Sequence, residues 1–169
     1  MTIKILPRLV ASQIAAGEVV ERPASVVKEL VENALDAKAR RISVEIRSGG
    51  MESIRVVDDG QGMSPEDAVL SLQRYATSKL VTVEDLDHIS TFGFRGEALP
   101  SIAAVSVFHM VTCPAKIDQG WQITVRDGEI SSQGPQGCPP GTTITISNLF
   151  HNVPVRRKFL RSNISEGRR

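Results

Sequence analysis

Residues 24–37 read ASVVKELVENALDA, and the apolar positions in this stretch decide the class of fold. From the first of them, apolar side chains recur at i+1, i+4, i+5, i+8 and i+9, a spacing that only a helix gathers on one face. These side chains are Val26, Val27, Leu30, Val31, Ala34 and Leu35. Pro23 suits the first turn of such a helix. The stretch therefore predicts an amphipathic helix that packs one face against the rest of the protein.

The residues after this helix predict two consecutive strands and a second helix. Residues 42–46 carry an apolar side chain at every second position, and a second alternating run passes through Ile54, Val56 and Asp58. A Ser-Gly-Gly break at 48–50 separates the two runs. A period of two is typical of half-buried strands, so a hairpin is expected, with a longer loop as the alternative. Ser64 is then expected to cap a helix whose first residue is Pro65.

The remaining elements alternate between helices and strands. We expect a long, partly ordered loop at 74–94 around a short helix at 83–89, a helix at 97–104, strands at 105–112, 121–125, 129–132 and 142–147, a loop at 132–141, and a basic helix that begins at 156–161. Asp127-Gly128 predicts a tight hairpin turn. Because strands joined by short turns pair antiparallel, we predict an α/β two-layer sandwich, with helices packed on one face of a mixed, mostly antiparallel sheet.

Length and composition limit the classes of protein that fit. A chain of 169 residues is expected to form one domain, and its net charge of +1 excludes a domain-wide positive field for a polyanion. Two cysteines, Cys113 and Cys138, are too few for a disulfide scaffold or a Cys-rich zinc site and are read as reduced thiols. The absence of a secretory signal or a long apolar span predicts a cytoplasmic protein without membrane contact.

Common nucleotide and zinc motifs are absent, so the candidate chemistry starts on the first helix. The chain contains no G-x-x-x-x-G-K-[ST], G-x-G-x-x-G, H-E-x-x-H or C-x-x-C. On a helical wheel Glu29, Asn33 and Asp36 fall within roughly a 60° sector beside the apolar stripe. Asn offers a neutral oxygen suited to a Mg²⁺ ion that phosphates and water hold, and a carboxylate one turn away suits a general base. The alternative is a solvated polar face.

Two glycine-rich turns are further candidates. Asp58 ends an alternating strand on the side of its apolar residues, where its carboxylate needs a hydrogen-bond donor such as the exocyclic amine of a ligand. The glycines of the following GQG at 60–62 let a flat ring approach the backbone. The sequence GFRGE at 93–97 opens a helix, and free N–H groups there favour an anion such as phosphate. The alternatives are a plain Asp-Gly turn and a helix start with flexible flanks.

Taken in order, these motifs resemble those of the ATPase superfamily of gyrases, heat-shock chaperones, histidine kinases and MutL proteins. Within it, the chain is most similar to the N-terminal ATPase region of the MutL family of DNA mismatch repair proteins. The matching segments are IAAGEVVERP at 14–23, residues 28–37, ATSK at 76–79, residues 93–99, GTT at 141–143 and PVRRKFL at 154–160. The resemblance covers nearly the whole chain and implies a Bergerat-type ATPase fold.

The resemblance implies a role for each matching residue. Glu29 would be the general base for hydrolysis and Asn33 the ligand of Mg²⁺. Asp58 would accept a hydrogen bond from the adenine amine, with Thr143 supporting it. Gly60, Gly62 and Met63 would shape the base pocket. The phosphate-binding lid would consist of Thr77, Ser78, Lys79, Gly93, Phe94, Arg95, Gly96, Glu97, Ala98 and Leu99.

The resemblance also implies the cofactors, the partners and the limits of the chain. It implies Mg²⁺-dependent ATP binding and slow hydrolysis that drive dimerisation and couple the mismatch-recognition protein MutS to downstream repair factors. Residues 1–169 would form the ATP-binding domain, incomplete at its C-terminal end, without the second, transducer-like domain and the dimerisation domain of the family. We therefore expect hydrolysis near background from this chain alone. The alternative is a fragment that only binds nucleotide or a partner.

Contact with DNA is a separate expectation. The basic residues Arg156, Arg157, Lys158 and Arg161 suit weak contact with DNA phosphates. A helix with a solvated basic face is the alternative.

Overall fold

The computed structural model describes residues 3–5, 7, 14, 16–17, 19–76 and 96–166, and for 161–166 it describes only the backbone. Its helices are α2 (Pro23–Asp36), the 3-10 turn η1 (Ser48–Gly50), α3 (Pro65–Leu70), α4 (Ala98–Ala104) and α5 (Pro154–Glu166). Its strands are β1 (Ile42–Arg47), β2 (Ser53–Asp58), β3 (Val107–Cys113), β4 (Gly120–Arg126), β5 (Glu129–Gln136) and β6 (Gly141–Ser147). Among these residues no helix is both long enough and apolar enough to span a membrane.

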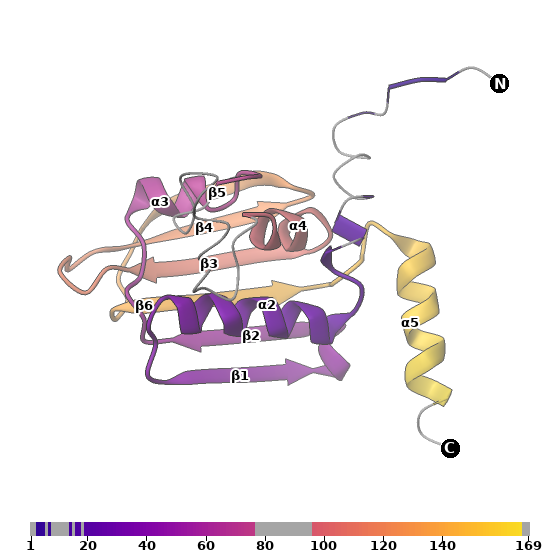
Figure 1. Ribbon diagram of the computed structural model, residues 1–169, viewed down its shortest axis with the longest axis horizontal. Helices are drawn as coiled ribbons and strands as arrows, with labels where there is room; N and C mark the ends of the chain where they lie inside the picture. The colour runs from indigo at the N-terminus through magenta and orange to yellow at the C-terminus, as the bar shows by residue number, and fades with distance from the viewer. Residues whose placement is uncertain are drawn as a thin grey trace, which may run out of the picture.

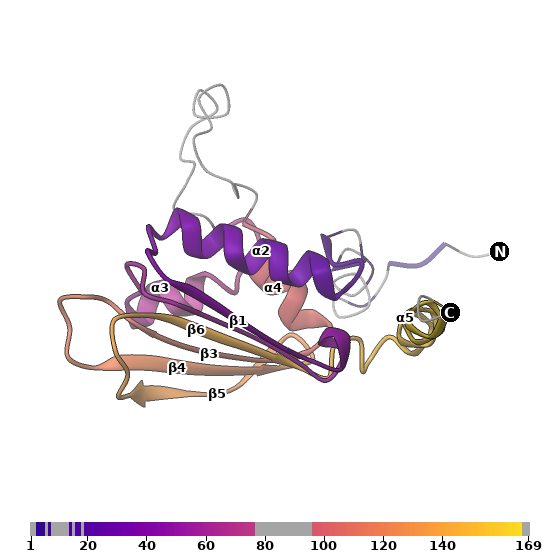
Figure 2. The ribbon, with the colours of Figure 1, turned by 90° about the horizontal axis from the view of Figure 1, so that it is seen from below.

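The six strands form one sheet, and three helices lie on one side of it. The strand order is β1-β2-β6-β3-β4-β5, and each neighbouring pair is antiparallel. Helices α2, α3 and α4 lie along the same face of this sheet, whereas α5 stands to one side (Figures 1 and 2). The predicted two-layer α/β sandwich is therefore confirmed.

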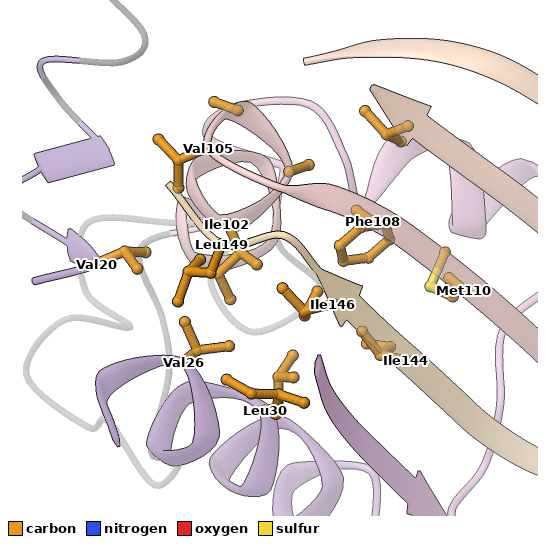
Figure 3. Close-up of a cluster of buried hydrophobic side chains, with 14 of the residues drawn as sticks. Val20, Val26, Leu30, Ile102, Val105, Phe108, Met110, Ile144, Ile146 and Leu149 are labelled. Atoms are coloured by element: carbon orange, nitrogen blue, oxygen red, sulfur yellow. The ribbon is translucent and has the colours of Figure 1, made fainter. Parts of the chain in front are cut away.

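The core lies between α2, α4 and the helix-facing side chains of the central strands. In Figure 3, Val26 and Leu30 of α2 point toward Ile144 and Ile146 of β6. The register continues this layer across the sheet, because Ile146 pairs with Phe108 of β3. Leu30, Ile146 and Phe108 are at most 2% exposed, and complete burial of side chains of this size contributes about 1.5–3 kcal/mol each.

The expected local signals are confirmed at several ends of elements. Helix α2 differs from the predicted 24–37 by one residue at each end. The Ser64 hydroxyl accepts the Asp67 N–H at 3.1 Å, and Pro65 begins α3. Asp127 and Gly128 both have positive φ between β4 and β5, as the predicted two-residue hairpin turn requires.

Two predicted boundaries are wrong. Strand β5 extends to Gln136 through a stretch that we expected to be loop, because it is an edge strand where Pro135 needs no ladder donor. Strand β3 begins at Val107 and not at 105, since the Ser106 hydroxyl bonds back to the Ile102 carbonyl at 2.7 Å and prolongs the end of α4. The predicted helix at 83–89 lies outside the described residues.

Candidate functional site

Asp58 ends β2 between two neighbouring strands, with its carboxylate on the helix side of the sheet. It pairs with Ile42 of β1 and with Thr142 of β6. Its Oδ1 accepts the Gly60 N–H at 2.8 Å, and the carboxylate also accepts the Thr142 N–H. Burial raises the pKa of Asp58, an effect that these two hydrogen bonds oppose and the nearby charge of Asp59 reinforces. The fold thus holds a half-buried carboxylate at the end of a central strand.

Two buried threonines join the three strand ends at this point. The Thr112 hydroxyl, on β3, accepts the Met63 N–H at 2.9 Å and lies 3.0 Å from the Thr142 hydroxyl. It also donates to the Gly141 carbonyl at 3.3 Å. Because Met63 follows the glycine-rich turn, this network fixes the turn against β3 and β6. Sequence reasoning missed Thr112, although its alternation with the buried Phe108 and Met110 of β3 marks it as a polar residue facing the core.

The expectation that Thr143 supports Asp58 is corrected by the register of the sheet. Thr142 is the residue opposite Asp58, whereas Thr143 pairs with Val57 and Val111. Neighbouring residues of a strand point to opposite faces, so the Thr143 side chain lies on the side of the sheet away from the helices. The same alternation is visible in the sequence, because Thr142 shares its parity with the buried Ile144 of β6.

Three glycines leave room for backbone to approach Asp58. A Cβ on Gly60 would lie 2.8 Å from both the Ala37 carbonyl oxygen and Asp58 Oδ1. Gly62, at φ +65°, could carry no Cβ without overlapping the Cys113 carbonyl, and Gly141, at φ +121°, none without overlapping the Asp58 carbonyl. All three positions require glycine sterically, and the positive φ of Gly62 and Gly141 requires it conformationally as well. The predicted glycine turn is therefore a close-packed cradle around the carboxylate.

The end of helix α2 is tied to this cradle. The Gln61 N–H donates to the Ala37 carbonyl at 2.9 Å. Asp59 Oδ1 accepts the backbone N–H groups of Arg40 and Arg41 at 2.7 and 2.8 Å. These bonds join the connection between α2 and β1 to the end of β2, so that α2 has a fixed position relative to Asp58.

Replacement of Asp59 is expected to weaken the fold in a pH-dependent way. Donation by the Arg41 and Arg40 N–H groups lowers the pKa of Asp59, so its ionised form stabilises the folded state. This contribution is present above the ordinary value of 3.8 and is lost as the pH falls through the lower folded pKa. Asp59→Ala should therefore lower Tm at pH 7, and the gap from wild type should narrow toward pH 2. A gap that stays constant in calorimetric melts from pH 7 to pH 2 would contradict this.

Glu29 and Asn33 lie on α2 upstream of the cradle. Both are half-buried, and the Glu29 side chain is 26% exposed, with Oε1 3.8 Å from Lys28 Nζ. The Ala37 N–H donates to the Asn33 carbonyl at 2.9 Å, so Asn33 lies one turn from the contact with Gln61. At 1.5 Å per residue, Glu29 lies about 12 Å along the helix from Ala37. Glu29 thus lies about two helical turns before the end of α2 that contacts the cradle.

The predicted lid residues are described only in part. Thr77, Ser78, Lys79, Gly93, Phe94 and Arg95 lie outside the described residues. Gly96 has φ +61°, and its carbonyl accepts the Tyr75 N–H at 3.0 Å. Glu97 is the N-cap residue of α4, and Ala98 and Leu99 form the first turn. The last four predicted positions therefore lie at the start of a helix that packs on the sheet.

Arg156 of the basic helix α5 is half-buried against the N-terminal part of the chain. Its guanidinium donates to the Val20 and Gly17 carbonyls at 2.9 and 3.1 Å and stacks over the Phe150 ring, 5.4 Å from the centroid. The expectation that Arg156 contacts DNA is therefore not supported by its position. Lys158 is exposed, whereas the side chain of Arg161 lies outside the described residues.

The donor set near the cradle fits a magnesium ion held mainly by a ligand. No group of three or more His, Cys, Asp or Glu suited to a metal occurs among the residues that the structure describes. Asn33 offers a single neutral oxygen on the helix between the cradle and Glu29. Mg²⁺ typically keeps several waters and binds through one or two protein oxygens together with phosphates. The residues present therefore fit this ion only in company with a phosphate ligand.

A family comparison covers most of this architecture. Residues 21–154 match the family described as histidine kinase-, DNA gyrase B- and HSP90-like ATPase. The match runs from the start of α2 through the cradle to the start of α5. The chain belongs to this ATPase family.

The chain is also similar to individual curated proteins and solved structures. The chain is 60% identical to the DNA mismatch repair protein MutL of Symbiobacterium thermophilum over 97% of its own length and 26% of the relative. It thus spans about a quarter of the length of this relative. The Aquifex aeolicus MutL ATPase domain complexed with ADP has a TM-score of 0.64 and 38% identity, over 83% of this chain and 48% of that one. The N-terminal domain of a DNA repair protein has a TM-score of 0.75 and 30% identity, over 92% and 44%.

Proposed function

We propose that this chain is the ATP-binding module of a DNA mismatch repair ATPase. The observation that carries the proposal is the half-buried Asp58 carboxylate, set in a glycine cradle that its own strand neighbours hold in place. The ADP complex of the similar MutL ATPase domain supports an adenine nucleotide as the ligand.

Asp58 recognises the adenine. Its carboxylate accepts the exocyclic amine, which guanine replaces with a carbonyl oxygen at the corresponding position. Gly60 and Gly62 shape the base pocket by letting the turn pack closely against the Ala37 and Cys113 carbonyls. The Met63 N–H, held by Thr112, fixes the turn against β3. The support for this role is that burial of a carboxylate is costly and here raises the pKa of Asp58, as is common at binding sites.

Asn33 and Glu29 serve the phosphate end. Asn33 would hold Mg²⁺ through its side-chain oxygen, and the ion would supply positive charge to offset the phosphates. Glu29 accepts a proton from the attacking water. Thr77, Ser78, Lys79 and the segment 93–99 bind the phosphates. The support is that both residues lie on helix α2. Glu29 lies about 12 Å along this helix from Ala37, where the helix contacts the cradle.

The proposed role in mismatch repair is taken from the longer MutL relatives. In it, nucleotide binding drives dimerisation and couples the mismatch-recognition protein MutS to downstream repair factors. The similarity to MutL proteins supports this role. The Arg156 guanidinium donates to the Val20 and Gly17 carbonyls. Weak contact with DNA would therefore involve Lys158 and its neighbours on α5.

Asn33→Ala tests the proposed site directly. Loss of the side-chain oxygen is expected to weaken ATP binding in the presence of Mg²⁺ by at least about tenfold, because a ligand of the ion is removed. Binding in EDTA should stay the same. Isothermal titration with ATP, with and without Mg²⁺, measures both values.

Glu32→Ala is the matched control on the same helix, because the Glu32 carboxylate pairs with Lys28 at 3.0 Å and the proposal gives it no role in the site. This variant should bind ATP like the wild type. Equal ATP affinities of wild type and Asn33→Ala at saturating Mg²⁺ would exclude Asn33 as the ligand.

A further inference from the structure

The two cysteines of the chain meet on the sheet face away from the helices. Cys113 ends β3, next to the helix-facing Thr112, and is 1% exposed. Thr112 pairs with Trp121, which brings Cys113 beside Gly120 on β4. Cys138, in the connection between β5 and β6, places its sulfur where a Cβ of Gly120 would stand. Gly120 therefore leaves the space in which one sulfur reaches the other.

The thiols are in contact and differ in access. The Cys113 thiol donates a hydrogen bond to the Ile117 carbonyl at 3.1 Å. A side-chain hydrogen bond also links the Cys113 and Cys138 thiols. Burial raises the pKa of Cys138, and the neighbouring Cys113 adds to the effect. Both are free thiols, one buried and the other partly exposed. Cys138 is therefore the thiol that a dissolved oxidant reaches first.

We propose that Cys113 and Cys138 form a disulfide when a small-molecule disulfide is supplied, and that this bond weakens nucleotide binding. The thiolate of Cys138 attacks oxidised glutathione, forms a mixed disulfide and releases one glutathione. The Cys113 thiolate then attacks the Cys138 sulfur and releases the second. The protein loses two electrons and two thiol protons, and one oxidised glutathione becomes two reduced molecules.

The backbone around both cysteines touches the cradle. The Cys113 carbonyl lies against Gly62, and the connection that carries Cys138 leads directly into Gly141, which lies against the Asp58 carbonyl. A disulfide draws two sulfurs from contact to about 2.05 Å. Because Gly62 and Gly141 pack closely against these backbone segments, a shift of either segment reaches the Asp58 cradle. This coupling rests on the proposed function and should raise the Kd for ADP by about fivefold or more.

The disulfide is tested without any nucleotide. The chain is incubated with oxidised glutathione, blocked with N-ethylmaleimide, digested without reduction and mapped by mass spectrometry. The expected product is a peptide pair joined through Cys113 and Cys138. Detection of unmodified thiols only, or of glutathione on Cys138 without the internal bond, overturns the proposal.

The coupling is tested by titration of ADP into reduced and oxidised protein. Cys138→Ser is the matched control, because it should bind ADP like the reduced wild type and should not respond to oxidised glutathione. An unchanged Kd in protein shown to carry the disulfide overturns the coupling alone. If reduced protein does not bind ADP, the proposed function and the coupling both fail, whereas peptide mapping still decides the disulfide.

Discussion

Asp58→Asn is expected to remove the preference for adenine nucleotides while leaving the fold intact. Asn keeps an oxygen for the Gly60 N–H but presents an amide donor where the adenine amine needs an acceptor. The amide N–H of the new Asn and the adenine amine would then face each other as two donors. In a half-buried site this lowers the binding free energy by about 1–3 kcal/mol, or roughly 5- to 150-fold in ATP affinity. Titrations of ATP and GTP against both proteins measure the change.

The thermal stability of Asp58→Asn separates a binding role from a structural one. Burial raises the folded pKa of Asp58, so at neutral pH its charge disfavours the folded state, and removing the charge should not lower Tm. Asp118→Asn, the same change on an exposed residue of the β3–β4 connection, is the control and should alter neither affinity nor specificity. An Asp58→Asn protein that still prefers ATP over GTP as wild type does would move the base pocket elsewhere.

Glu29→Ala is expected to slow hydrolysis by about 10²- to 10⁴-fold and to change ATP affinity little, because a general base acts in the transition state. The effect should be measured in a longer protein that also carries the region that follows in the MutL relatives. Single-turnover hydrolysis with excess enzyme gives the rate of the chemical step.

Glu32→Ala again provides the comparison for Glu29. Glu32 lies one helical turn from Lys28 and forms an ion pair with it. Its replacement by Ala should leave the single-turnover rate unchanged. If the longer protein hydrolyses ATP and its Glu29→Ala form matches it within about twofold, Glu29 is not the base.

Much of the fold follows from local patterns in the sequence. The stripe of α2 and the alternation of β1 and β2 depend on side-chain periodicity, which local residues determine. The cap of α3 depends on Ser64 and Pro65 alone. The end of β5 does not follow in this way, because Pro135 is acceptable only where the strand lies at the edge of the sheet.

The site shows the same division between local and long-range information. The position of Asp58 on the helix side of the sheet follows from its parity with Val56. The pairing of Asp58 with Thr142 depends on the register between β2 and β6, which are far apart in sequence. The hydrogen bond from Met63 to Thr112 likewise joins residues 49 positions apart. Patterns within single strands could not supply these contacts.

The contacts of Arg156 also could not be predicted from the local sequence. Its place in a basic run predicts a solvated or phosphate-binding residue. In the structure its guanidinium donates to the carbonyls of Val20 and Gly17, which precede it in the chain by 136 and 139 positions. Only the tertiary fold brings those carbonyls within reach, so composition alone could not separate Arg156 from Lys158.

The central claim is that adenine nucleotide binds in the cradle around Asp58. The most direct test is a titration of ADP into ¹⁵N-labelled protein, followed through the backbone amide signals. We predict that the amides of Gly60, Met63 and Thr142 shift with ADP and shift much less with GDP at the same concentrations. ADP that leaves these three signals in place, or shifts only signals far from the ends of β2, β3 and β6, would contradict the account.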